Sequence, residues 1–231
     1  MKSYLRISLA AIAIALSFNA FAITETKAQG VLNEILKRME VNRNTMKTLR
    51  SDVKMVKYNA QLKEADTTQG RSIYLPAKGR DAYVRIDWIK PVEETLTVVN
   101  GKYTLYRPRI KQAIVGNAKE AQGNGKATGA LSFMNMSKEQ LKANYAIKYL
   151  GEEKVSGGVP TWHLELTPKV AANFKMAELW VDGDGMPIQA KVIETNNDTT
   201  TVLLSNIEKN ANINVSLFEV KLPKGTQIIK G

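Results

Sequence analysis

The amino-acid sequence predicts a mainly β protein of the α+β class, built on a strongly curved antiparallel sheet of about ten short strands. One amphipathic helix stands near the start of the chain, and apolar and polar residues alternate through most of the sequence after it. Turn signals rich in Gly, Asn and Asp separate the alternating runs. A single helical segment interrupts them. We expect the amphipathic first helix to cover the open side of the curved sheet.

The first 22 residues are typical of a cleaved signal peptide. Lys2 and Arg6 precede an apolar run over residues 9–18, and residues 20–22 (Ala-Phe-Ala) form the small-x-small pattern after which signal peptidase cuts. The apolar run is much shorter than the roughly 20 residues that a membrane-spanning helix needs. We therefore expect an exported chain in which residues 23–231 form a single domain.

Composition argues against several classes of protein. The chain has no cysteine, which excludes disulfides and a lipid anchor on an N-terminal cysteine. Its formal net charge of +11 would suggest nucleic-acid binding in a cytoplasmic protein, but export and the scatter of lysines along the chain favour a solvated basic surface. The alternative interpretation of this charge is long-range attraction to anionic membrane surfaces or acidic partners.

The first helix is predicted roughly from Thr24 to Leu49. Its apolar residues recur at the spacing of one helix face, with charged and amide side chains between them. The stripe consists of Val31, Leu32, Ile35, Leu36 and Met39, and it continues weakly through Met46 and Leu49. A helix with one such face is expected to pack on an apolar surface.

Alternation with a period of two is clearest from Arg80 to Trp88. One face of this run carries Ala82, Val84, Ile86 and Trp88, and the other carries Asp81, Tyr83, Arg85 and Asp87. Asn100-Gly101 between two strand-like runs predicts a hairpin, because both turn residues need positive φ. The other predicted strands cover residues 95–99, 102–107, 109–116, 145–150, 161–167, 176–181, 188–194 and 199–207, with turns at Gly157-Gly158 and from Asp182 to Gly185.

Two segments interrupt the strands. Residues 117–128, rich in Gly, Ala and Lys, predict a mobile loop. Ser137 followed by Gln140 three residues later predicts the capped start of a short helix. Methionine adapts its shape to varied apolar partners, so the insertion before this helix either fills the core or contacts a ligand. Its apolar residues are Leu131, Phe133, Met134 and Met136.

Residues suited to catalysis or metal binding are scarce. The single histidine, His163, is predicted on the polar face of a strand, and no second histidine or cysteine exists to complete a zinc or copper site. Nucleophile, phosphate-loop and dinucleotide motifs are missing, and the acidic turn at residues 182–185 lacks the later oxygen ligands of a calcium loop. We therefore predict a protein that is not an enzyme, with no catalytic residue, no metal and no cofactor. A hydrolase that uses His163 is the alternative.

An ordered set of motifs runs from Arg80 to Gln112. Arg80 stands eleven residues before Pro91, and residues 100–102 (Asn-Gly-Lys) precede Tyr106, Pro108 and Gln112. In this order the motifs resemble those of the periplasmic outer-membrane lipoprotein carrier family (LolA-like proteins). That family has approximately R-P-x-x-F-x-W ending at a K/Q-P, then D-G-K-x-L-x-x-Y-x-P-x-x-x-Q. Residues 180–182 resemble its late hairpin, and residues 217–225 resemble its closing F-x-F-x-x-P-x-G.

The resemblance implies an incomplete antiparallel β barrel of about 10–11 strands, with an α-helical lid enclosing an apolar cavity. It implies a periplasmic carrier, in a Gram-negative-type envelope, that shields the acyl chains of lipoproteins and shuttles them from the inner to the outer membrane. The expected partners are acylated lipoproteins or other lipids, an inner-membrane lipoprotein-releasing transporter and an outer-membrane acceptor, with no nucleic acid and a monomeric state. The alternatives are a carrier or sensor of another lipid or glycolipid on the same fold, and a non-catalytic regulatory binding module.

The resemblance also assigns roles to residues. Arg80 takes the place of an arginine that holds the lid closed through hydrogen bonds until cargo arrives, and Lys78 is close enough to compete for this role. Asp81 follows Arg80 where the family has proline, and Val84 and Ile86 replace its aromatic pair, which could reshape the cavity and change its cargo. The residues expected to line the cavity are Leu32, Ile35, Leu36, Met39, Val84, Ile86, Trp88, Leu96, Val98, Leu131, Phe133, Met134 and Met136.

Overall fold

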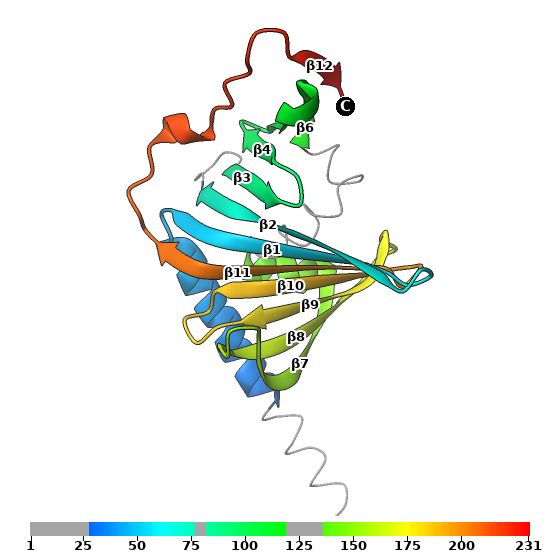
Figure 1. Cartoon of the computed structure of the whole chain (residues 1–231). Coiled ribbons are helices and arrows are strands. Elements are labelled where there is room, and N and C mark those ends of the chain that lie inside the picture. Colours follow the sequence, from blue (N-terminus) through cyan, green and yellow to red (C-terminus); the bar gives the residue numbers. More distant parts are fainter. Residues whose placement is uncertain (1–27, 77–81, 119–135) are drawn as a thin grey trace, which may run out of the picture.

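Twelve strands form one sheet in the computed structural model, which describes residues 28–76, 82–118 and 136–231 (Figure 1). The strands are β1 (Leu49–Asn59), β2 (Glu64–Leu75), β3 (Tyr83–Lys90), β4 (Glu94–Val99), β5 (Lys102–Arg107), β6 (Gln112–Asn117), β7 (Tyr145–Lys154), β8 (Pro160–Pro168), β9 (Phe174–Val181), β10 (Pro187–Glu194), β11 (Thr199–Lys209) and β12 (Gln227–Lys230). Their spatial order is β12-β6-β5-β4-β3-β2-β1-β11-β10-β9-β8-β7. The sheet is open, because β12 and β7 stand at opposite ends of this order. The predicted incomplete barrel is confirmed, with twelve strands where the sequence indicated 10 or 11.

Two runs of neighbouring strands meet in the middle of the sheet. Strands β1 to β6 follow one another in space, as do β7 to β11, and β11 pairs with β1. Adjacent strands are antiparallel throughout, except that β12 runs parallel to β6. Asn100 and Gly101 have φ angles of 49° and 72°, which confirms the predicted hairpin between β4 and β5.

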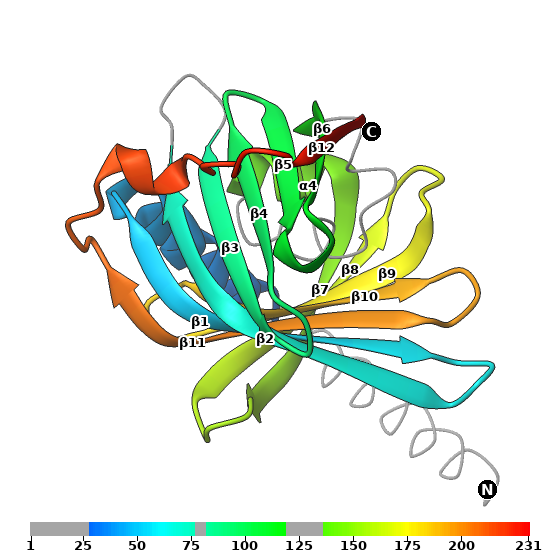
Figure 2. The ribbon, with the colours of Figure 1, turned by 45° about the horizontal axis from the view of Figure 1, so that its top comes forward.

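Two helices of the described residues form the lid. The long helix, described over residues 28–45, lies on the inner side of the curved sheet (Figures 1 and 2). Four residues of its predicted stripe, Leu32, Ile35, Leu36 and Met39, are at most 6% exposed and share one core with strands from both halves of the sheet. The fifth, Val31, is 38% exposed, so the prediction is wrong at this position. The second helix, α4 (Lys138–Asn144), starts at the capping box predicted from Ser137 and Gln140. Among the described residues, no helix combines the length and the apolar character needed to span a membrane.

The predicted C-terminal boundary of the long helix is wrong. The helix ends at residue 45, whereas Leu49 begins β1 and is buried there. The Thr45 hydroxyl donates to the Val41 carbonyl oxygen at 2.9 Å, and the Thr48 hydroxyl ties the link to the Ala211 carbonyl oxygen at 2.6 Å. Met46 and Leu49 still pack against the core beyond the end of the helix, so their apolar spacing did not indicate where the helix ends.

The start of the strand predicted at residues 109–116 is also wrong. Pro108–Ile110 forms a 3-10 turn, and Lys111 follows in the left-handed region with φ of 47°. Strand β6 begins only at Gln112. Proline fixes φ and donates no backbone hydrogen bond, which favours a turn over a ladder position here.

The C-terminal segment, residues 210–226, crosses the outer face of the sheet before β12 joins β6 (Figure 2). Phe218 is 1% exposed and packs edge-on against Tyr83, with ring centroids 5.7 Å apart. Arg85 donates from Nη1 to the Leu217 carbonyl oxygen at 2.8 Å. Tyr83 therefore lies on the strand face predicted to be polar but is buried, because a distant part of the chain covers it.

Candidate functional site: an apolar pocket under the lid helix

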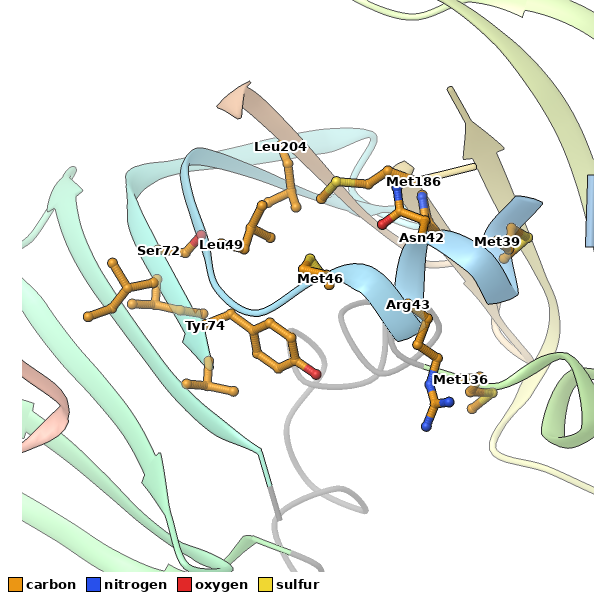
Figure 3. A pocket seen from close by; sticks show the side chains of 14 residues that line it. Met39, Asn42, Arg43, Met46, Leu49, Ser72, Tyr74, Met136, Met186 and Leu204 are labelled. Atoms are coloured by element: carbon orange, nitrogen blue, oxygen red, sulfur yellow. The ribbon is translucent and has the colours of Figure 1, made fainter. Parts of the chain in front are cut away.

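A pocket opens between the C-terminal half of the long helix and strands β1 to β3 (Figure 3). Its cavity volume is about 80 Å³. This volume is well below the roughly 300–1,000 Å³ of pockets that enclose whole small ligands. The lining residues are Met39, Asn42, Arg43, Met46, Leu49, Ser72, Ile73, Tyr74, Val84, Ile86, Met136, Met186, Pro187 and Leu204.

Methionine is the most frequent residue in this lining. Met39, Met46, Met136 and Met186 all contribute, which is four of the eight methionines of the chain. Met39 lies in the long helix and Met46 in the link after it, whereas Met136 precedes α4 and Met186 directly precedes β10. All four are drawn in Figure 3. An unbranched thioether adapts to irregular apolar shapes. The pocket can therefore accommodate apolar groups of varied shape.

One flank of the long helix is fixed tightly to the turn between β9 and β10. Gly185 has φ of +84°, and a Cβ atom at this position would lie 2.3 Å from the carbonyl carbon of Arg38. Arg38 donates from Nη1 to the Gly183 carbonyl oxygen at 3.0 Å, and its guanidinium lies 5.3 Å from the Trp162 ring centroid. Only glycine allows this approach of turn backbone to helix backbone. The pocket lies toward β1 to β3, on the side of the helix nearer its C-terminal end.

Helix α4 is hydrogen-bonded to the long helix at two points. The backbone N–H of Lys138 donates to Glu40 Oε2 at 3.1 Å, and Lys142 Nζ donates to Asn33 Oδ1 at 3.4 Å. Because the later residue of α4 meets the earlier residue of the long helix, the two helices run in opposite directions. Leu141 is 1% exposed and anchors α4 in the main core. This packing brings Met136, two residues before α4, to the pocket.

The polar lining residues of the pocket are Asn42, Arg43, Ser72 and Tyr74, and the half-exposed Arg43 marks its mouth. Figure 3 shows the Tyr74 hydroxyl directed toward the side on which Arg43 lies, with Met136 beyond it. Burial raises the pKa of the Tyr74 hydroxyl, and the positive charge of Arg43 opposes that rise. The Ser72 hydroxyl is paired with the Ser51 hydroxyl at 2.7 Å. Arg43 is thus the charged side chain among the lining residues.

The predicted cavity residues fall into three groups. Those that line the pocket are Met39, Val84, Ile86 and Met136. Those in or against the main core are Leu32, Ile35, Leu36, Trp88 and Leu96, while Val98 is half-buried on β4 beside Val84. Those outside the described residues are Leu131, Phe133 and Met134, together with the gate candidates Arg80 and Lys78 and the signal peptide at residues 1–22.

Sequence reasoning missed Arg43, Tyr74 and several other lining residues. Arg43 follows Met39 by four positions, a spacing that places both on one side of a helix. Because Arg43 is charged, it was not counted with the apolar face of the helix. Tyr74 lies on β2, a strand that the sequence did not delimit, because its first half is exposed and its alternation is broken at Gly70.

His163 lies away from the pocket, on β8. Its ring stacks on the Trp180 ring with centroids 4.2 Å apart. Nδ1 lies 2.9 Å from Glu153 Oε2, and Nε2 lies 3.1 Å from Glu178 Oε2. Both ring nitrogens face carboxylates, and no group of three side chains suited to a metal occurs in the described parts of the chain. This arrangement ties β7, β8 and β9 together.

Comparison with known proteins places this fold in a family. Residues 44–221 match the model of the family described as outer membrane lipoprotein carrier protein LolA. The chain belongs to the LolA family. The resemblance found in the sequence from Arg80 to Gln112 is thereby confirmed, and the family is one of binding and carrier proteins. No curated protein sequence gives a match.

Solved structures share the LolA-like fold at low sequence identity. An uncharacterized conserved protein from Thermus thermophilus is 14% identical with a TM-score of 0.56, covering 87% of this chain and 99% of its own. MucB is 14% identical with a TM-score of 0.53, over 82% of this chain but only 62% of the MucB chain. At these identities the likeness shows the fold alone.

Proposed function

We propose that this LolA-family protein is a periplasmic carrier that shields the acyl chains of lipoproteins and shuttles them from the inner to the outer membrane. The observation that carries the proposal is the methionine-lined pocket between the lid helix and the sheet. Each methylene that leaves water contributes roughly 0.8 kcal/mol. A mostly apolar lining therefore binds an acyl chain of many methylenes strongly, because it removes them from water.

Loading of long acyl chains needs a wider pocket than the present one, and the lid is built to permit it. The β9–β10 turn fixes one flank of the long helix through Gly185 and Arg38. On the pocket side the helix meets the adaptable side chains of Met46, Met136 and Met186. We assign the gate that controls this widening to Arg80, on its position in the family pattern, with Lys78 as the competing residue. Loss of ligand gating in Arg80→Leu but not in Lys78→Leu distinguishes them.

The proposed path starts with export by residues 1–22 and release into the periplasm as a monomer. An inner-membrane lipoprotein-releasing transporter supplies the cargo, and an outer-membrane acceptor receives it. No cofactor and no catalytic step enter this cycle, because transfer needs only differences in the burial of acyl chains.

A carrier of another lipid is the second candidate, and one observation favours it. Val84 and Ile86, which replace the aromatic pair of the family pattern, both line the pocket. Smaller aliphatic side chains at these positions change the shape offered to the cargo. A glycolipid or free phospholipid then becomes the ligand in place of a lipoprotein.

Titration of the detergent-free protein with the apolar fluorophore N-phenyl-1-naphthylamine tests the proposal. We expect saturable binding that a synthetic triacylated lipopeptide displaces and the same peptide without acyl chains does not. Met46→Trp, which fills the pocket, should weaken binding, whereas Val215→Trp on the exposed C-terminal segment should not. Absence of saturable binding would overturn the carrier proposal. Displacement by diacyl lipid but not by lipopeptide would favour the second candidate.

A further inference from the structure

The pocket mouth carries a positive charge that burial of acyl chains does not require. Arg43 lines the pocket, and its side chain is 45% exposed. Its one ion pair among the described residues is with Glu40, at 3.5 Å between Nη1 and Oε1. That distance is at the long end for a hydrogen bond, so most of the guanidinium donors remain available to a ligand.

The acidic groups near Arg43 have other partners or are in solvent. Glu40 also accepts from the backbone N–H of Lys138 through Oε2, at 3.1 Å. Glu139 has a lowered pKa, first because of hydrogen bonds to the backbone and to Ser137, with Arg43 a minor cause. Neither carboxylate is among the residues that line the pocket. Among the described residues, the charge presented to a ligand at the mouth is that of Arg43.

Tyr74 provides a second donor on the same side. Among the described residues its hydroxyl has no hydrogen-bond partner, although its ring lines the pocket. A tyrosine hydroxyl is protonated at neutral pH, and burial raises the pKa of Tyr74 further, so the hydroxyl can donate a hydrogen bond to an anion. An always-charged guanidinium and a protonated phenol beside an apolar interior suit an anionic head group that sits above an acyl chain.

We propose that the pocket mouth is a head-group subsite for an anionic amphiphile, in which Arg43 and Tyr74 bind a carboxylate or phosphate while the acyl chain occupies the methionine-lined interior. This inference rests on the proposed function, since it assumes that the pocket holds an acyl chain. It adds a preference that a purely apolar carrier would lack. The net charge of +11 supports it, because a basic protein attracts anionic amphiphiles at long range.

Competition against bound N-phenyl-1-naphthylamine tests the subsite, with dodecanoate, dodecyl phosphate and the neutral dodecanol as competitors of equal chain length. We expect both anions to bind roughly tenfold more tightly than dodecanol, a ratio that corresponds to about 1.4 kcal/mol. Arg43→Gln should remove this preference for anions without weakening the binding of dodecanol. The matched control is Lys37→Gln, which removes an exposed charge from the same helix outside the pocket and should keep the preference.

The outcomes separate the two proposals. Equal binding of the three competitors, or an equal loss of all three in Arg43→Gln, would overturn the head-group subsite and leave the apolar carrier intact. Failure of the fluorophore to bind would overturn both. Tighter binding of dodecanoate than of dodecyl phosphate assigns the subsite to carboxylates, and the reverse order assigns it to phosphates. A higher salt concentration should weaken the binding of the two anions and leave the binding of dodecanol unchanged, because salt screens a half-exposed ion pair.

Discussion

Gly185 offers a sharp test of how the lid helix is held. Its φ of +84° is unfavourable for a residue with a Cβ atom, and that atom would lie 2.3 Å from the carbonyl carbon of Arg38, 2.5 Å from its oxygen and 2.6 Å from the Met39 nitrogen. All three are backbone atoms, so no side-chain rotation relieves the contact. Gly185→Ala must displace the helix or the turn.

Two costs add in Gly185→Ala. The left-handed backbone costs about 1–2 kcal/mol with a Cβ atom present, and forcing extra volume into a packed contact costs about 1–3 kcal/mol. We expect the free energy of unfolding to fall by about 2–5 kcal/mol, the sum of these two costs, measured by urea denaturation. The displaced helix should also bind more N-phenyl-1-naphthylamine, because its flank leaves the β9–β10 turn.

Gly183→Ala is the matched control for this substitution. Gly183 lies two residues earlier in the same turn, and a Cβ atom there meets nothing within 4 Å. We expect a change within about 0.5 kcal/mol, as for ordinary surface substitutions. Equal stability of the two variants would refute the account of a helix fixed by direct backbone contact.

Further substitutions probe other parts of the account. Phe218→Ala should lower the free energy of unfolding by about 3–5 kcal/mol, whereas Leu217→Ala, at an exposed neighbouring position, should change it little. Similar losses in the two variants would contradict the burial of Phe218 under the C-terminal segment. Ser137→Ala removes the capping box and should speed amide exchange in α4, at a cost of about 1 kcal/mol. His163→Ala should leave fluorophore binding unchanged, and loss of binding would place His163 in the site. Burial raises the pKa of Tyr74, so stability should hold below the unfolded-state pKa of 10.0 and decline above it, less steeply in Tyr74→Phe, as pH-dependent urea denaturation would show.

Local periodicity was enough to predict the fold class. Strands such as β3 and β9 alternate because one face packs on the core, and this pattern needs no knowledge of the partner strand. The helix stripe and the Asn100-Gly101 turn were predictable for the same local reasons. Strand β2 was harder, because Gly70 lies where a Cβ atom would approach the Asp87 carbonyl oxygen to 2.3 Å. That close approach depends on β3 and leaves no alternation to detect.

The site was predictable only in its apolar half. Met39, Val84 and Ile86 were expected from apolar periodicity, and each lines the pocket. Arg43 and Tyr74 were not, because their relation is made by the packing of the helix against β2. The burial of Tyr83 had the same cause, since Phe218, far later in the chain, covers it. Contacts between distant segments leave no periodic signal in either segment.

The central claim is that acyl chains occupy the methionine-lined pocket, and methyl NMR of the methionine side chains tests it most directly. Labelled protein would be titrated with the triacylated lipopeptide and, as a control, with the unacylated peptide. The account predicts shifts at Met39, Met46, Met136 and Met186, while Met55 in the core of β1 and Met176 on β9 stay unchanged. Unchanged signals from all four pocket methionines, or shifts confined to Met55 and Met176, would contradict it.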